Sequence, residues 1–518
     1  MSAYEMKSES AVRVGDVVEH YPEGTGTKGS KTGVKRIFSF TQMFCFILSY
    51  MSSWEALAGS FGLVFYNGGP RAIVWGFFIV VPGVLCQVAS LAEMSSLQPI
   101  AGAQYHWTWH LAPPHVRRFV TWIQGWITWF SWISLLCGVT NTCANITNAL
   151  ISITHPNYVV QGWHTLLIMY AYLIVFGAMN MYLFWIIPWL EFLAGILHVV
   201  LWVVVVTVLT TLAPRHSSEF VFFEQSKGMS GWDNEFVQFN LGIILITWAF
   251  VGFDAAVHIS EETRKARHVI PRSIFWSICV NATLAFGMVL VLLYSFGNVA
   301  DNMYASYPLA AISLAATASP AGASVLIAGP LTINISVVLG SIASVSRLTW
   351  AWSRDSGLPS YFSYVDPKHR IPIRSVWLPI VVTMLLALLN LTNSYTAFGA
   401  ILALCTVGLY QSYFIAIACM LHARLTGRVE AAPWSLGRLG VPVNAFALVY
   451  SVWLGVFMLF PNYLPVDGAG FNYALPINAA VWIFALVFWF AWGRKRWPGL
   501  DIDIIAKVVA DSDRTTKD

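Results

Sequence analysis

Two side chains that can exchange a proton lie within one long apolar stretch, residues 237–262 (VQFNLGIILITWAFVGFDAAVHISEE). Asp254 and His258 are four residues apart, so on a helix they face the same side and can form a hydrogen bond. Histidine switches between neutral and cationic forms near physiological pH, which suits proton handling. A carboxylate at membrane depth costs roughly 2.5–3.5 kcal/mol on insertion scales, so it must face a partner or a cavity. This stretch therefore holds the first candidate site.

Two interpretations of the backbone in this stretch are open. In the first, Gly252 packs within a continuous helix and Asp254 simply bonds to His258. In the second, the chain around Gly252 interrupts the helix, which a bilayer tolerates only where the loosened backbone lines a cavity. Interrupted helices near the membrane midplane form the substrate sites of many transporters. The candidate binding residues here are Phe250, Val251, Gly252, Phe253 and Asp254.

A second candidate site lies in the first apolar stretch, where Glu55 is the only acidic or basic residue. The surrounding sequence Ser-Ser-Trp-Glu-Ala replaces strong helix formers by serine and a charge, and Gly59 and Gly62 follow. We predict another helix interruption here. The alternative is a serine-rich contact between helices in which Glu55 pairs with a neighbour. The candidate binding residues are Ser52, Ser53, Trp54, Glu55 and Ala56.

Other apolar stretches supply further candidates. Trp126 can hold an ammonium group against its ring by a cation–π interaction of about 0.5–2 kcal/mol, although simple packing is the more common role of a tryptophan. His198 is a candidate for proton handling or a hydrogen-bonded core residue. Glu191 is expected to stay hydrated near the inner end of its helix. His106 and His110 form an H-x-x-x-H pair, but one such pair is too little for a metal site.

Composition assigns the chain to the membrane. Of its 518 residues, 57% are hydrophobic and 10% are charged, whereas soluble domains are about a quarter charged. A helix that crosses a bilayer needs about 20 apolar residues. The candidate spans are residues 38–66, 71–97, 117–148, 162–183, 186–212, 238–260, 272–296, 322–350, 376–391, 395–420, 443–461 and 473–493. The expected fold class is an all-α integral membrane protein with 12 transmembrane helices.

The distribution of positive charge orients these spans. With the N-terminus inside, all but three of the 29 Lys and Arg residues fall in inner loops or in the two tails. The exceptions are Arg71, Arg215 and Lys227. By the positive-inside rule, both termini are cytoplasmic. We expect a disordered N-terminal tail over residues 1–36, a membrane domain over 37–493 and a C-terminal tail over 494–518.

The two candidate interruptions occupy corresponding places in the chain. The first and sixth spans each begin a set of five, in residues 37–213 and 237–420. Because five is odd, the second set enters the membrane from the opposite side, which gives the inverted repeat of many secondary transporters. The last two spans, in residues 443–493, lie outside the repeats. The halves show no direct sequence identity, so this repeat is inferred from topology alone.

Three motifs carry a resemblance to a known family. They are F-V-G-F-D-A-A-V-H-x-S-E-E at 250–262, A-E-x-S-S-x-x-P-x-A-G-x-Q-Y-H-W at 92–107 and R-x-x-x-A-x-x-R-D-x-G-x-P at 347–359. With most of the remaining chain, they resemble the fungal amino acid/choline transporters, a choline/GABA permease-like family of the amino acid–polyamine–organocation superfamily. The resemblance implies a LeuT-like 5+5 inverted repeat with two peripheral helices, and a substrate bound between helices 1, 3, 6, 8 and 10.

The resemblance also implies a gate at the cytoplasmic mouth. Arg347, Arg354 and Asp355 belong to the third motif and would form an ion-pair cluster there. Glu93 belongs to the second motif, which would form the inner mouth. Superfamily members that use protons often carry a basic side chain on helix 5 where sodium-coupled relatives bind an ion. His198 falls near that place.

One departure from the family pattern bears on the substrate. Relatives that bind α-amino acids tend to hold the carboxylate on a glycine-rich break in helix 1, whereas this chain has Glu55 there. A carboxylate repels another carboxylate and attracts an amine. Glu55 or Asp254 would therefore counter a cation, and the preferred substrates become choline, a polyamine or γ-aminobutyrate. Trp54, Trp126 and the phenylalanines of the second break would stack on or gate that substrate.

These observations predict a proton-coupled importer of a small amine-bearing solute, working by alternating access in the plasma membrane of a fungal cell. We expect no nucleic-acid partner, cofactor or metal, and no nucleophile–base arrangement indicates an enzyme. The alternatives are a channel, a non-transporting nutrient sensor and a neutral α-amino acid permease. A channel should show a continuous polar stripe, and a sensor usually has a longer cytoplasmic tail than the roughly 25 residues present at this C-terminus.

Overall fold

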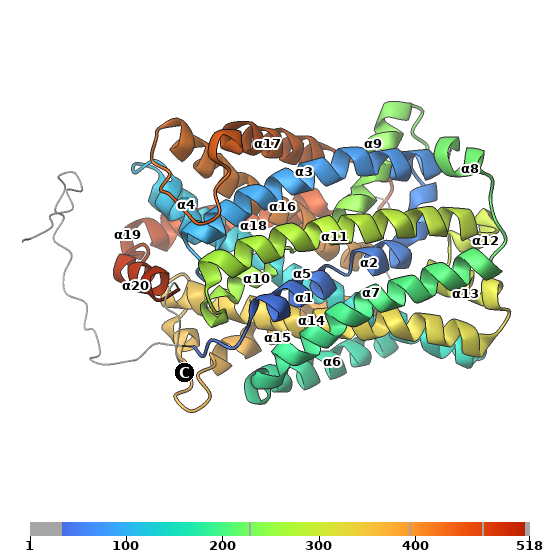
Figure 1. The fold of residues 1–518 in the computed structure, drawn as a ribbon, viewed down its shortest axis with the longest axis horizontal. Helices are drawn as coiled ribbons and strands as arrows, with labels where there is room; N and C mark the ends of the chain where they lie inside the picture. The colour runs from blue at the N-terminus through green and yellow to red at the C-terminus, as the bar shows by residue number, and fades with distance from the viewer. Residues whose placement is uncertain (1–33, 227–228, 393–394, 469–470, 513–518) are drawn as a thin grey trace, which may run out of the picture. The chain divides into compact units, whose positions relative to one another are not determined.

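The computed structural model describes residues 34–226, 229–392, 395–468 and 471–512. Within these ranges the regular elements are helices, apart from an isolated bridge between Phe38 and Thr263 (Figure 1). The long helices are α3 (Gly69–Leu97), α5 (Arg117–Thr154), α6 (Gly162–Tyr182), α7 (Ile187–Leu212), α11 (Ala266–Ser295), α14 (Pro320–Arg354), α15 (Ile373–Ala387), α16 (Tyr395–Leu425), α17 (Gly440–Phe457) and α18 (Ala474–Phe488). Each coincides with a predicted span to within a few residues.

Nine helices of the described part of the chain are long and apolar enough to cross a membrane. The predicted spans outside this set are α5, whose Trp, Thr and Asn side chains lower its hydropathy, and the two stretches with candidate interruptions. The chain is therefore an all-helical integral membrane protein. Within the bundle, α5 packs along α14 and α16, while α11 packs along α3 and α7. Figure 1 shows α3, α11 and α7 running side by side.

The first apolar stretch is broken at a single residue. Helix α1 (Phe40–Met51) ends at Ser52, whose φ of 34° and ψ of 45° are left-handed, and α2 (Ser53–Ser60) starts immediately after it. A non-glycine residue pays roughly 1–2 kcal/mol for this conformation. The prediction of an interruption is confirmed at Ser52. Its predicted extent, to Ala56, is wrong, because the chain from Ser53 onward is already helical.

The second apolar stretch is broken over a longer segment. Helix α9 (Glu235–Trp248) ends before residues 249–254, which form turns, and the short helix α10 (Ala255–His258) follows. Gly252 has a φ of 83°, a conformation that glycine adopts without the steric cost of a Cβ atom. The predicted interruption at 250–254 is confirmed, and the alternative of a continuous helix is wrong.

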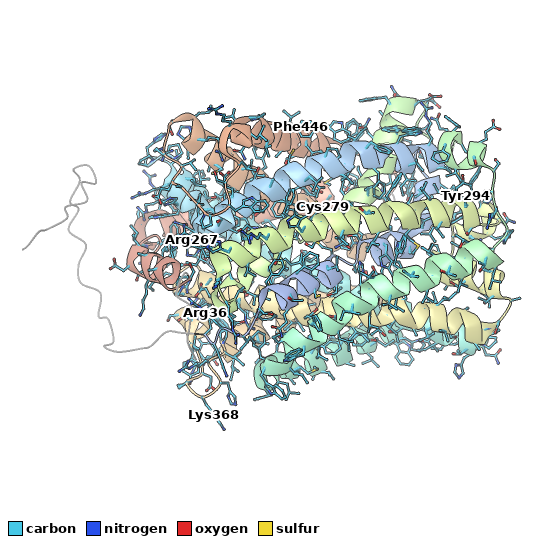
Figure 2. All side chains as sticks on the ribbon, in the orientation of Figure 1. Arg36, Arg267, Cys279, Tyr294, Lys368 and Phe446 are labelled. Atoms are coloured by element: carbon cyan, nitrogen blue, oxygen red, sulfur yellow. The ribbon has the colours of Figure 1, made fainter. Side chains whose placement is uncertain are left out.

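Charged side chains mark one end of the bundle. Figure 2 shows Arg36, Arg267 and Lys368 near one end of the helices and Tyr294 near the other. At the charged end the chain before α1 is fixed, because the amide N–H groups of Ile37 and Phe38 donate to the Glu262 carbonyl. Most of the predicted N-terminal tail, residues 1–33, lies outside the described residues.

The predicted C-terminal tail is folded in its described part. It contains the short helices α19 (Arg494–Arg496) and α20 (Ile502–Ser512). Between them Trp497 is fully buried, and its indole N–H donates to the Asp355 carbonyl oxygen at 2.8 Å. This segment therefore packs against the membrane domain at the end of α14.

Candidate functional site

The two helix breaks touch each other. Ser53 is the first residue after the first break, and Ala249 is the first residue after α9. The Ser53 hydroxyl donates to the Ala249 carbonyl oxygen at 2.6 Å. An interrupted helix leaves backbone carbonyls without an intrahelical partner, and Ser53 satisfies one of them. The two candidate binding segments that the sequence singles out therefore form one buried region.

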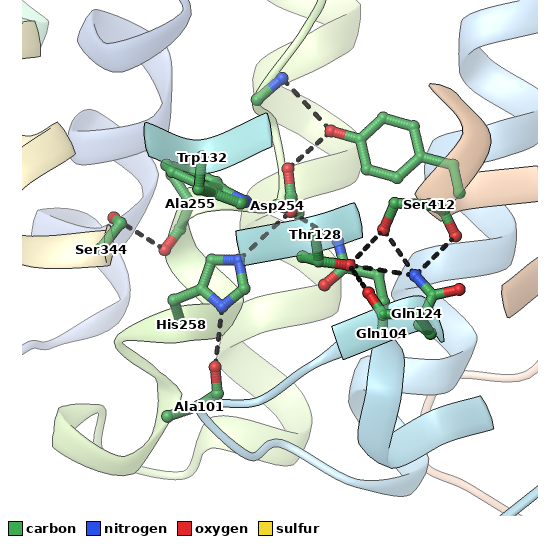
Figure 3. Close-up of polar contacts among 12 residues, drawn as sticks. Ala101, Gln104, Gln124, Thr128, Trp132, Asp254, Ala255, His258, Ser344 and Ser412 are labelled. Carbon is green, nitrogen blue, oxygen red and sulfur yellow. Dashed lines mark hydrogen bonds and ion pairs between the residues drawn. The ribbon is translucent and has the colours of Figure 1, made fainter. Parts of the chain in front are cut away.

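Asp254 is the centre of a dense hydrogen-bond network at the second break (Figure 3). The side chain is fully buried. Its Oδ1 accepts from the Tyr413 hydroxyl at 2.6 Å, and its Oδ2 accepts from Gln104 Nε2 at 2.5 Å and Trp132 Nε1 at 3.1 Å, with His258 Nε2 at 3.3 Å. These donors come from α16, α4 (Gln104–Leu111), α5 and α10. A carboxylate with this many donors holds four elements together and has little capacity left for a substrate.

The Asp254–His258 pair must contain a proton between its two members. His258 Nδ1 lies 2.7 Å from the Ala101 carbonyl oxygen, which can only accept, so Nδ1 carries a hydrogen. The other ring nitrogen, Nε2, faces the Asp254 carboxylate. Contact between two unprotonated acceptors would be repulsive, so a proton lies on Nε2 or on the carboxyl group. The predicted i, i+4 pairing is confirmed as a contact.

The backbone of the second break is fixed from α16. The Gly252 N–H donates to the Tyr413 hydroxyl oxygen at 3.3 Å, while the Phe253 ring lies 4.8 Å, centroid to centroid, from the Tyr413 ring. Phe250 makes an edge contact with Phe77 of α3, and Val251 is buried. The residues of this segment are therefore packed against neighbouring helices.

At the first break, Glu55 and His198 form one buried pair. Glu55 Oε1 lies 2.8 Å from His198 Nδ1, and both side chains are inaccessible to solvent. The Trp54 indole N–H donates to the His198 carbonyl oxygen at 3.3 Å, which ties α2 to α7 a second time. Ser52 is buried beside them, and the Ala56 N–H donates to its carbonyl oxygen at 2.8 Å. The sequence predicted separate roles for Glu55 and His198, whereas the structure joins them.

Trp126 lies away from the two helix breaks. It is buried against Trp352 of α14 and Phe484 of α18, with ring centroids 6.0 and 5.0 Å away. The tryptophan of α5 that reaches the second break is Trp132, which donates to Asp254. A stacking role for Trp126 on a substrate at the breaks is therefore not supported by its position.

The two arginines of the third motif form ion pairs with the end of the first motif. Arg347 pairs with Glu262 at 3.1 Å and covers the Phe184 ring, while Arg354 pairs with Glu261 at 3.2 Å. The partners of both arginines come from outside the third motif, and the gate that these residues would form stays a prediction. Because the two glutamates end the first motif, these ion pairs connect the segment after the second break to the end of α14.

Asp355 faces another element. Its Oδ2 accepts from the Tyr105 hydroxyl at 2.7 Å and lies 3.2 Å from His106 Nε2, both on α4. Burial alone would raise the pKa of the Asp355 carboxyl, but His106, Arg354 and Tyr105 outweigh it and the net shift is downward. Asp355 therefore remains ionised and holds α4 to the end of α14.

Glu93 closes the same end of the bundle. Its Oε2 accepts from the Arg424 guanidinium of α16, and its Oε1 accepts from the Ser435 hydroxyl at 3.1 Å and the Leu436 N–H at 3.0 Å. Glu93 thus joins α3 to α16 and to the loop before α17.

Glu191 is a further buried carboxylate. The sequence suggested that it stays hydrated, but it is 1% exposed. Its Oε2 accepts from Ser336 of α14 at 2.6 Å and lies 3.3 Å from the Ser49 hydroxyl of α1. That expectation is wrong because α1 and α14 pack over this face of α7.

Sequence reasoning missed three donors around Asp254. Gln104 was visible in the Q-Y-H-W run, since a buried amide in a motif needs a partner. Trp132 shares α5 with Trp126 but points to another side. No sequence feature indicated Tyr413, because a tyrosine in an apolar helix can face lipid, the protein core or a binding site.

The chain has relatives among known proteins. The family model described as amino acid permease matches residues 38–485. Amino-acid permease 2 of Neurospora crassa is 29% identical over 90% of this chain and 86% of its own length. A choline transporter of Saccharomyces cerevisiae is 26% identical over 92% of this chain and 85% of its own. An uncharacterized amino-acid permease of Schizosaccharomyces pombe is 28% identical over 92% of this chain and 89% of its own length.

The family match spans both broken helices and all the residues around them described in this subsection. The predicted resemblance is confirmed. Apolar helices, two touching breaks and buried carboxylates are the features expected of a protein that moves a small solute through a bilayer. The chain belongs to the amino acid permease family of membrane transporters.

Proposed function

We propose that this chain is a secondary active transporter that imports a small amine-bearing solute by alternating access. The observation that carries the proposal is the contact between the two breaks, from the Ser53 hydroxyl to the Ala249 carbonyl. Discontinuous helices at corresponding places in two halves form the substrate sites of many secondary transporters. A substrate between these breaks would meet backbone groups from both.

The proposed topology has twelve spans. Besides the nine apolar helices, α5 has 38 residues, ample to cross a bilayer at 1.5 Å per residue. The pairs α1/α2 and α9/α10 would each cross as one interrupted helix. Spans one to five and six to ten then form the inverted 5+5 repeat of a LeuT-like fold. Arg36, Arg267 and Lys368 at one end (Figure 2) support cytoplasmic termini by the positive-inside rule.

The substrate proposal rests on the first break. Glu55 uses one carboxylate oxygen for His198, and its second oxygen has no hydrogen-bond partner among the described residues. A buried acceptor of this kind attracts a positively charged donor. The relatives' names, amino-acid permease and choline transporter, both refer to solutes with a positively charged nitrogen. The plasma membrane is the proposed location.

Proton coupling is the second part of the proposal. The Asp254–His258 pair holds a proton between its two side chains, which lie just before the start and at the end of α10. His198 pairs with Glu55, the carboxylate proposed to bind the amine. The ion pairs of Arg347, Arg354 and Glu93 join elements at the proposed cytoplasmic end. We infer that these pairs separate when solute is released into the cell, because they would otherwise block the path.

The test is uptake into proteoliposomes that contain the full chain. Radiolabelled choline, γ-aminobutyrate, putrescine and a neutral amino acid are offered with and without an inward proton gradient. We expect saturable uptake of at least one amine, stimulated by the gradient and lost in Glu55→Gln, while the exposed control Glu219→Gln keeps it. Uptake that survives in the double variant Asp254→Asn/His198→Ala with unchanged pH dependence would refute the role of these residues in proton handling. Binding without uptake would favour a sensor.

A further inference from the structure

Three buried polar atoms near the first break lack a hydrogen-bond partner within the described part of the chain. They are Glu55 Oε2, His198 Nε2 and the Tyr307 hydroxyl. The residues are 1%, 0% and 4% exposed. Buried polar groups are nearly always satisfied by protein, water or a ligand, because an unpaired one costs about 1–3 kcal/mol. Three such atoms in one neighbourhood offer a ligand three hydrogen-bonding groups.

The three residues belong to one neighbourhood. Glu55 and His198 are in direct contact at 2.8 Å. Tyr307, which precedes α13 (Pro308–Thr317), packs its ring so closely on Gly59 that a Cβ atom there would lie 2.9 Å from a ring carbon. Gly59 is four residues after Glu55, so on α2 the two positions lie on the same face. The Tyr307 ring therefore covers the face of α2 that carries Glu55.

The Tyr307 hydroxyl is neutral. Burial raises its pKa most, and the negative charge of Glu55 raises it further, followed by Cys143. A neutral hydroxyl offers two lone pairs and can accept a hydrogen bond. This matters for ligand chemistry, since the oxygen can serve as an acceptor beside the carboxylate.

All three orphan atoms can act as acceptors. When His198 Nδ1 carries the proton that it donates to Glu55 Oε1, Nε2 is left with a lone pair. Glu55 Oε2 and the Tyr307 oxygen are acceptors as well. A primary ammonium group has three N–H donors on one compact centre. A quaternary trimethylammonium group has none and would leave all three atoms unpaired.

We propose that Glu55, His198 and Tyr307 form a subsite for a primary ammonium group, which makes the protein selective for primary amines over their N-methylated analogues. This inference rests on the proposed function and narrows its substrate class. A site built to hydrogen-bond a ligand rejects an analogue that lacks the donors far more strongly than an apolar site rejects an extra methyl group. Tyr307, ahead of α13, lies against the α2 side of the subsite, where its ring packs on Gly59.

The experiment is competition and uptake with two methylation series on the wild-type full chain in proteoliposomes. One compares γ-aminobutyrate with its N-trimethyl derivative, and the other runs from ethanolamine through its N-methyl and N,N-dimethyl derivatives to choline. We expect affinity to fall at each methylation and by at least about tenfold overall. A profile that is flat or rises toward the quaternary ammonium overturns the subsite, and a trapped water in place of the amine would give such a profile.

A matched pair of variants locates the selectivity. Tyr307→Phe removes a hydroxyl that has no partner among the described side chains, so the protein should fold normally. We expect it to lose several-fold of the preference for the primary amine, whereas Tyr304→Phe, on a residue 65% exposed, should keep the full preference. An unchanged preference in Tyr307→Phe overturns the role of Tyr307.

Failure of the proposed function has a different signature. If no amine of either series is transported, or stabilises the purified protein against thermal unfolding, then the chain does not carry amines and both proposals fall. If amines are transported without discrimination by methylation, the proposed function stands and only the subsite is refuted.

Discussion

The two helix breaks contain carboxylates in opposite situations. Asp254 at the second break faces four donors from four elements, so each of its oxygens is satisfied. Glu55 after the first break has one partner, His198, and one oxygen without a partner in the described structure. A satisfied buried group holds its surroundings together, whereas an unsatisfied one is available to a ligand. The sequence alone makes the two acidic residues look equivalent, and only their donors distinguish a structural centre from a candidate binding group.

The backbones of the two breaks differ in a parallel way. The second break spans residues 249–254 and contains a glycine with a φ of 83°. The first uses one residue, Ser52, in a left-handed conformation that serine adopts at a cost. The larger break is held by side chains around Asp254, and the smaller one is flanked by the contacts of Ser53 with Ala249 and of Glu55 with His198.

The largest expected effect comes from exchanging the carboxylates for amides. Asp254→Asn places an NH2 group against donors and breaks the buried pair with His258, so we expect a loss of about 3–5 kcal/mol in the free energy of unfolding. Glu55→Gln keeps an acceptor for His198 and should cost about 1 kcal/mol. Thermal unfolding in detergent measures both, with the exposed Asp233→Asn as the control. Equal losses of stability in Asp254→Asn and Glu55→Gln would contradict the difference between the two carboxylates.

A smaller difference is expected between two tyrosines. The Tyr413 hydroxyl donates to Asp254 and accepts from the Gly252 N–H, so Tyr413→Phe should lower the free energy of unfolding by about 2 kcal/mol. Tyr307→Phe should leave it nearly unchanged, because that hydroxyl has no partner in the described structure. The thermal unfolding midpoints of the two tyrosine variants test this difference. A large loss in Tyr307→Phe would mean that its hydroxyl is satisfied in the folded protein.

The smallest effects concern the backbone. Gly252→Ala forces a Cβ atom to a positive φ and within 3.1 Å of a Leu135 methyl carbon, which should destabilise the protein by about 1 kcal/mol or more. Ser52→Gly relieves a left-handed serine, but it also loosens the unfolded chain, so a net gain of only about 0.5 kcal/mol is expected. Shifts of the unfolding midpoint in opposite directions for the two variants would confirm this contrast between the breaks. Destabilisation by Ser52→Gly would contradict it.

Much of the fold follows from local sequence. Long apolar stretches predicted the helices to within a few residues, because the bilayer forces backbone groups to hydrogen-bond within each segment. The break at Gly252 was predicted from glycine beside a charge. The extent of the first break was overestimated, since serine can be helical and only Ser52 leaves the helix. Part of the candidate site was also predicted, but Trp126 was placed in it on residue type alone.

What the sequence by itself determined is the all-helical membrane class, the approximate positions of the helices and of both breaks, and the acidic residues in or beside those breaks. These features depend on the composition of short segments and on the cost of exposing backbone or charge to lipid. The tertiary structure decided the partners. Glu55 meets His198 across 143 residues and Tyr413 meets Asp254 across 159. Such contacts depend on how packed helices are rotated and shifted against one another, which no local pattern specifies.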